Sequence, residues 1–244
     1  MPKASQMKSL MVIACLLAAA AAAADDGATI TLATKLQAPA GQCYRGVEKK
    51  CDGKSPPELQ CNSLFGGFEE HKEKMADFIK TNVQRNFQYL MFSTHFSNYE
   101  ANRAGLEKLY RGLSDEAWND AIELIKYSAK RGSHISVNAT VNDVDISKDT
   151  FTKHEVGSLA TVLDLHKSLA VEAHNLHKHF SDSDETKKQY DPDVSSFLEN
   201  NFLSKHTETV RTLSGHTNDL INMLHETADG SLALFLFDEY LQKL

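Results

Sequence analysis

The stretch Met75–Phe96, with the sequence MADFIKTNVQRNFQYLMFSTHF, decides the fold of this chain. Mostly apolar residues recur in it at steps of three and four, the spacing of one face of an α-helix. These residues are Ile79, Val83, Phe87, Leu90 and Thr94. A neighbouring face carries the polar side chains of Asn82, Asn86, Tyr89 and Ser93. We expect the apolar stripe to face the core of a helical bundle, and the polar flank to face either solvent or a polar bundle centre.

Three further long segments show the same helical periodicity. The first of the four predicted helices begins near Phe68, and the four cover about 68–96, 102–130, 147–181 and 192–227. Pro192, near the start of the fourth helix, and Gly230, beyond its end, are the residue types favoured at those termini. Each helix is far longer than the usual 11–12 residues or so. Four such helices in one chain predict an all-α, four-helix bundle.

The connections and the C-terminus complete the predicted fold. Short turns join helices one to two and three to four, whereas 134–146 is long enough for an extended crossover along the bundle between helices two and three. The last segment, Ser231–Leu244, is apolar on nearly every side and predicts a short fifth helix. Other subunits are expected to bury its remaining apolar surface, and a helix that caps its own monomer is the alternative.

Residues 1–24 have the three-part build of a secretory signal peptide. Lys3 and Lys8 precede a charge-free apolar run, Leu10–Ala24, with cleavage expected at about 22–24. The run is made mainly of alanine and is shorter than the roughly 20 residues of a membrane span. No second stretch of the chain is apolar for long enough to cross a bilayer. We therefore expect a soluble protein of the secretory pathway with no membrane partner.

Residues 25–67 form an irregular extension that contains prolines, glycines and the cysteines Cys43, Cys51 and Cys61. An oxidising compartment makes these cysteines disulfide candidates, and their odd number leaves one thiol for another chain. A zinc site is the weaker alternative, because the segment has no CxxC pair and no histidine among its cysteines. The pairing stays open. Within the domain that follows, 68–244, Asn138 begins the only N-glycosylation sequon of the chain.

Several local motifs resemble those of ferritins. They are QYLMFSTHF in helix one, AKRG at the end of helix two, LHKSL and NLHKHF in helix three, SSFLENNFL at the start of helix four, and SLALFLFDEYL at the C-terminus. The leader, the cysteine-bearing extension and the sequon resemble the secreted ferritins of insects and related arthropods. The resemblance implies a ferritin-like bundle, and a hollow shell of twenty-four heavy-type and light-type subunits that stores iron as a ferric oxide mineral.

The resemblance also locates the positions of a ferroxidase centre, where paired iron ions need several carboxylates and a Glu-x-x-His pair on one helix. In this chain those positions hold Asn82, Tyr89, Ala117, Asp120, His166 and His206. The tyrosine is retained, but no Glu-x-x-His pair occurs anywhere in the sequence. We therefore expect a light-type subunit that is not itself an enzyme. Oxidation of Fe²⁺ is expected from a heavy-type partner chain, linked to this one by disulfide bonds.

Other residues are candidates for iron handling. Asp115 and Glu116 form an acidic patch where light-type ferritins present carboxylates to the shell cavity, so they are expected to nucleate the mineral. The alternative is an ordinary solvated helix face. His177 and Glu199 match positions of the three-fold iron channel, although Ser196 stands where an aspartate is expected, which weakens the attraction for Fe²⁺.

Three further side chains match the four-fold channel of ferritins, namely Leu232, Leu236 and Tyr240. An apolar lining favours packing over ion passage. The histidine run of His174, His177 and His179 is an alternative metal site, although ordinary surface histidines are the simpler interpretation.

Two other functions remain open. The first is a catalytically competent ferritin in which His166, His206, Asp120 and Tyr89 replace the usual ligands. His166 and His206 lie on the inward stripes of helices three and four, so they are expected to meet, either as a hydrogen-bonded pair or as a residual metal site with Asp120. The second is a secreted four-helix signalling protein without iron. The formal net charge of −7 argues against nucleic acid as a partner.

Overall fold

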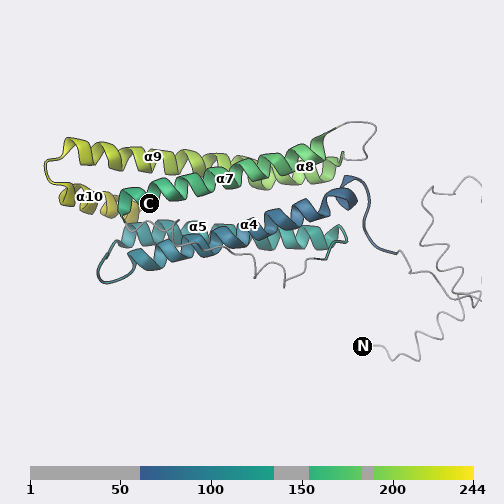
Figure 1. Ribbon diagram of the computed structural model, residues 1–244, viewed down its shortest axis with the longest axis horizontal. Helices are drawn as coiled ribbons and strands as arrows, with labels where there is room; N and C mark the ends of the chain where they lie inside the picture. Colours follow the sequence, from purple (N-terminus) through teal and green to yellow (C-terminus); the bar gives the residue numbers. More distant parts are fainter. Residues whose placement is uncertain (1–60, 135–153, 183–189) are drawn as a thin grey trace, which may run out of the picture. The chain divides into compact units, whose positions relative to one another are not determined.

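The structure is a computed structural model that describes residues 61–134, 154–182 and 190–244. Every regular element within these ranges is a helix. The described residues from Ser63 onward belong to one compact unit. The architecture confirms the predicted all-α four-helix bundle with a short additional helix at the C-terminus (Figure 1).

Four long rods build the bundle. The first three are α4 (Gly67–Phe96), α5 (Ala104–Lys130) and α7 (Glu155–Ser181). The fourth consists of α8 (Pro192–Leu198), the π-helical segment η2 (Glu199–Leu203) and α9 (Ser204–Glu226). α4 packs mainly along α5 and α7 along α9, so that the bundle consists of two helical hairpins (Figure 1). The last helix, α10 (Gly230–Lys243), packs against α5 and α9.

The buried face of α4 differs from the predicted apolar stripe. Ile79 is buried, but the Phe87 side chain is 42% exposed, and Val83 and Leu90 are only partly buried. The polar flank faces the bundle centre, which is one of its two predicted orientations, because Asn82 and Tyr89 are fully buried. Both faces have helical periodicity, and the core contains Tyr89 of the flank together with Phe92 and Phe96. The prediction that the stripe through Phe87 forms the core was therefore wrong.

A buried arginine joins the ends of three rods. Arg131 follows α5, and its guanidinium donates to Asp191, the residue that caps α8, with 2.6 Å between Nη2 and Oδ2. The same nitrogen donates to the Phe65 carbonyl ahead of α4 at 3.1 Å. Residues 63–67 of the predicted extension thus lie against the bundle. Pro192 occupies the first turn of α8, as predicted, directly after its Asp191 cap.

Several predicted features lie outside the described residues. These are the signal peptide, Cys43, Cys51, most of the crossover with Asn138, and residues 147–153 at the predicted start of helix three. Cys61 is described and is disulfide-bonded. Among the described helices, none has both the length and the apolar character that a membrane span requires.

Gly105 of α5 lies against Asp238 and Leu241 of α10, and it provides a test of how tightly α10 is held. A Cβ atom at Gly105 would clash with the Asp238 carbonyl oxygen and would lie 2.9 Å from the Leu241 Cβ. We expect Gly105→Ala to push α10 away and to lower the free energy of unfolding by about 1–3 kcal/mol, the usual cost of overpacking. Urea denaturation at fixed subunit concentration, with limited proteolysis of α10, measures both effects.

Gly112, on the same helix, is the matched control. Nothing lies within 4 Å of a Cβ atom built there. Gly112→Ala is therefore expected to raise stability by about 0.5–1 kcal/mol, because alanine favours a helix interior over glycine. Equal stability of the two variants would show that α10 adapts to the added methyl group without cost.

Candidate functional site

Tyr89, His166 and His206 form a line of polar groups across the centre of the bundle. Their helices, α4, α7 and α9, each bury one of them on an inward face. The Tyr89 Oη atom lies 3.2 Å from His166 Nδ1. On the other side of that ring, His166 Nε2 lies 3.4 Å from His206 Nδ1. The two histidines therefore meet inside the bundle, as the inward stripes of their helices predict.

These three groups are held in their neutral forms. Burial, with a smaller effect of the Lys205 charge, lowers the pKa of His166 from 6.5 to about 4. Burial also lowers the pKa of His206 to about 3, with further contributions from His166 and Lys205. Burial raises the pKa of Tyr89, so the phenol keeps its proton. The site at neutral pH is an uncharged hydrogen-bonded line rather than a group of anions.

Asn82 and Ala117 occupy buried positions beside this line. The Asn82 amide nitrogen donates to the Phe78 carbonyl of its own helix at 2.8 Å. Asn82 Oδ1 and His206 Nε2 are both buried without a hydrogen-bond partner in the structure. Ala117 is only 4% exposed and brings no polar atom to the site. Two of the six positions that the resemblance assigned to a ferroxidase centre therefore contribute no charge.

Asp120, the one carboxylate among the six positions, forms an ion pair with Lys205 of α9. Its Oδ1 atom lies 2.6 Å from Lys205 Nζ, and the Asp120 side chain is 6% exposed. Burial raises the pKa of Asp120, and the hydrogen bond and charge of Lys205 oppose that rise. The lysine thus compensates the only buried negative charge of the site. Sequence reasoning missed Lys205, because no local pattern shows that it reaches a residue of α5.

The chemistry that this arrangement supports is limited. Within 61–134, 154–182 and 190–244, no group of three or more His, Cys, Asp or Glu side chains is arranged to hold a metal ion. Iron prefers hard oxygen ligands, and a pair of iron ions needs several anionic carboxylates. Here two neutral imidazoles and a phenol meet instead, and the Asn82 amide bonds the Phe78 carbonyl of its own helix. The two hydrogen bonds of the line partly satisfy these buried polar groups.

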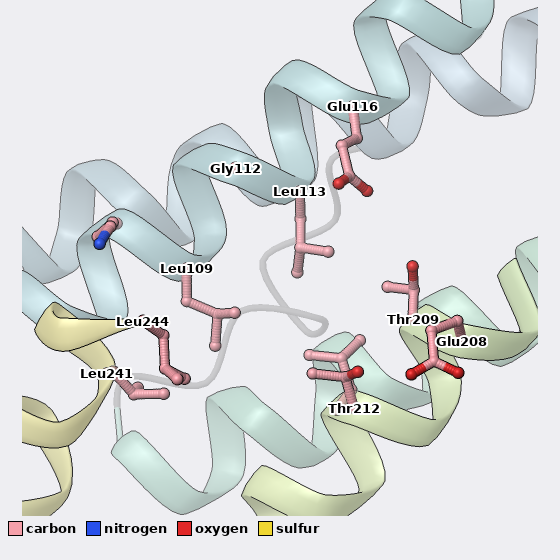
Figure 2. A pocket seen from close by; sticks show the side chains of 11 residues that line it. Leu109, Gly112, Leu113, Glu116, Glu208, Thr209, Thr212, Leu241 and Leu244 are labelled. Carbon is pink, nitrogen blue, oxygen red and sulfur yellow. The ribbon is translucent and has the colours of Figure 1, made fainter. Parts of the chain in front are cut away.

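Asp115 and Glu116, the residues of α5 that are expected to nucleate the mineral, are exposed. Asp115 is 3.2 Å from Arg111 Nε in a surface ion pair in which both side chains are 58% exposed. Glu116 lines a pocket of about 330 Å³ between α5, α9 and α10, and Glu208 of α9 lines the same pocket (Figure 2). Sequence reasoning missed Glu208, although a charged residue within the predicted fourth helix is expected to lie on its exposed face. The structure thus places Glu116 with Glu208, and Asp115 with an arginine.

His177 and Glu199 are brought together as the resemblance implies. The His177 Nε2 atom lies 2.8 Å from Glu199 Oε1, where η2 begins, and Ser181 Oγ is 3.1 Å from the same nitrogen. The other two histidines of the run point elsewhere. The exposed His174 bonds the Ala170 carbonyl, and the His179 ring lies against His71 with 5.5 Å between centroids. The three histidines therefore do not converge on one site.

The predicted four-fold residues are on the surface of α10. Leu232, Leu236 and Tyr240 are 49%, 50% and 47% exposed. Phe235, beside them, is 53% exposed. This helix buries Ala233, Phe237 and Leu241 against the bundle and leaves a broad apolar surface uncovered.

Comparisons with known proteins agree with this architecture. No family model matches the chain. The ferritin light chain of Drosophila melanogaster is 38% identical over 186 residues, which cover 75% of this chain and 81% of that protein. The ferritin light chain of Trichoplusia ni is 35% identical over 212 residues, or 84% and 91% of the two chains. A crystal structure of the secreted ferritin of Trichoplusia ni matches with a TM-score of 0.71 and 35% identity, covering 83% of this chain and 98% of that one.

Proposed function

Because this chain belongs to the ferritin family of iron-storage proteins, we propose that it is a light-type subunit that builds the shell and supports the mineral without oxidising iron itself. The observation that carries the proposal is the Asp120–Lys205 ion pair, at 2.6 Å. Lys205 compensates the only carboxylate among the six positions that the resemblance assigned to a ferroxidase centre. The other buried groups, Asn82, Tyr89, His166 and His206, are neutral, and Ala117 is apolar.

The charge at the bundle centre supports this function over ferroxidase activity. Two ferrous ions bring four positive charges into a buried site, and burial of uncompensated charge is costly. A ferroxidase centre lowers that cost with several carboxylates. This chain instead supplies Asp120, which is already paired, and a lysine cation. The centre therefore disfavours the first step of oxidation, the binding of two cations.

Mineral nucleation is the second part of the proposed function. Asp115, Glu116 and Glu208 are exposed carboxylates on α5 and α9. Exposed carboxylates bind Fe³⁺ as hard oxygen ligands and so lower the barrier to the first ferric clusters. Glu116 and Glu208 offer ligands from two helices. Asp115 and Glu208 are each paired with an arginine, Arg111 and Arg211 respectively. We propose Glu116 as the principal nucleating residue.

Assembly and location complete the proposal. We place the chain in a shell of twenty-four subunits in the secretory pathway or outside the cell, together with a heavy-type subunit that oxidises iron. Cys61 already forms a disulfide bond within this chain. We therefore propose that Cys43 or Cys51 bridges to the heavy-type subunit, and that Asn138 carries the glycan. The exposed apolar surface of α10 packs against other copies. His177 and Glu199 line the three-fold channel for iron.

Iron oxidation by the iron-free homopolymer tests the proposal. We expect slow oxidation of Fe²⁺ with no fast phase that saturates at two irons per subunit, followed by oxygen uptake and absorbance. Substituting His166 and His206 by leucine should leave that rate unchanged. Size-exclusion chromatography is the assembly control. A fast, saturating phase that the double substitution abolishes would instead establish a ferroxidase with altered ligands, and a monomer or dimer would argue against a shell subunit.

A further inference from the structure

The pocket between α5, α9 and α10 is unusual because its two ends have different chemistry. Leucine side chains line one end, near the C-terminus, and two carboxylates line the other (Figure 2). The leucines are Leu109, Leu113, Leu213, Leu241 and Leu244. The carboxylates are those of Glu116 and Glu208, which project from facing helices (Figure 2). A volume of about 330 Å³ is within the range of sites that hold small organic ligands.

The charged groups around the pocket favour a cation at its acidic end. Glu208 has one exposed partner, Arg211, at 2.9 Å, and exposed ion pairs of this kind are weak. The only basic residue that lines the pocket within the described chain is Lys108. Its ammonium group already donates to the Gln242 carbonyl at 3.0 Å. An anion would face two like charges, whereas a cation gains attraction from both carboxylates.

A glycine keeps the pocket open. Gly112 lies on the pocket wall in the middle of α5, and nothing lies within 4 Å of a Cβ atom built there. Glycine is unfavourable in a helix interior relative to alanine. A side chain longer than a methyl group at this position would extend into the space between the two carboxylates and the leucines. The pocket therefore depends on the absence of that side chain.

We propose that this pocket binds an amphipathic organic cation, whose alkyl chain contacts the leucines and whose charged group lies between Glu116 and Glu208. Burial of the alkyl chain supplies the affinity, since each buried methylene contributes favourably. The two carboxylates supply the preference for positive charge. This inference goes beyond iron storage, because a hydrated ferric cluster has no use for the leucine end.

Calorimetric titration of the intact, iron-free protein tests the inference. The probe is decyltrimethylammonium below its micelle concentration, and decyl sulfate is the anionic probe with the same chain length. We expect saturable binding of the cation, at least tenfold weaker binding of the anion, and about tenfold weaker cation binding after the double substitution Glu116→Gln and Glu208→Gln. Equal affinity for both probes, or no binding of the cation, would overturn the proposal.

Gly112→Leu provides the blocking variant, and Gly215→Leu on α9 is its matched control. Gly215 also lies within a helix with open space around it, but it does not line the pocket. We expect Gly112→Leu to reduce cation affinity at least tenfold and Gly215→Leu to leave it unchanged. Equal binding by both variants would place the probe elsewhere, for example on α10. Gly112→Leu keeps both carboxylates, so its effect on organic binding is separable from mineral nucleation.

Discussion

Replacing Arg131 with leucine will lower the free energy of unfolding by about 3–5 kcal/mol, as is typical when one partner of a buried ion pair is removed. The Arg131 side chain is 3% exposed and that of Asp191 is 5% exposed. Without the guanidinium, the Asp191 carboxylate stays buried with two backbone N–H donors among the described residues, those of Phe68 and Val194. Urea denaturation at fixed subunit concentration gives the change.

Arg111→Leu is the matched control, because Arg111 also pairs with an aspartate but lies on the surface. Its expected effect is within about 1 kcal/mol of zero. Adding Asp191→Asn to Arg131→Leu should recover part of the loss, since asparagine keeps the capping oxygen and removes the buried charge. If Arg131→Leu and Arg111→Leu had equal effects, the arginine would not hold the rod ends together.

The fold was predictable because its signal is local and repeated. Helical periodicity over four long segments, with a proline at the first turn of α8, predicted the elements and the bundle class. The orientation of α4 was not predictable in the same way. Phe87 is 42% exposed, whereas Asn82 is fully buried, because partners on other helices decide which face of a doubly periodic helix is covered.

The candidate site was predictable in its membership and not in its contacts. The resemblance named Asp120 and His206, and the inward stripes predicted that His166 and His206 meet. Lys205 is separated from Asp120 by 85 residues in sequence, and its ion pair depends on the docking of α9 against α5. Glu208 was missed for the same reason, because it comes to line one pocket with Glu116 only in the folded bundle, where α9 lies near α5.

Acidification is expected to destabilise this bundle steeply, with His166 and His206 as the main cause. Their pKa values are lowered to about 4 and about 3, whereas an unfolded histidine titrates near 6.5. As the pH falls below 6.5, the unfolded chain takes up protons that the folded chain does not. The contribution of the two histidines to the free energy of unfolding is therefore fully present above pH 6.5 and is lost below it. Between pH 6 and 4 the loss approaches about 1.4 kcal/mol per pH unit for each histidine.

Substitution of one histidine isolates this effect. His206→Gln keeps a hydrogen-bonding side chain that does not titrate, so the slope of unfolding free energy against pH should fall by about 1.4 kcal/mol per pH unit between pH 6 and 4. His225→Gln is the matched control, because His225 is exposed in the last turn of α9 and lies outside the buried line. Urea denaturation across this pH range measures the slopes. If the wild-type chain and His206→Gln had equal slopes, His206 would take up its proton in the folded bundle as readily as in the unfolded chain, and the buried pair would not be a neutral one.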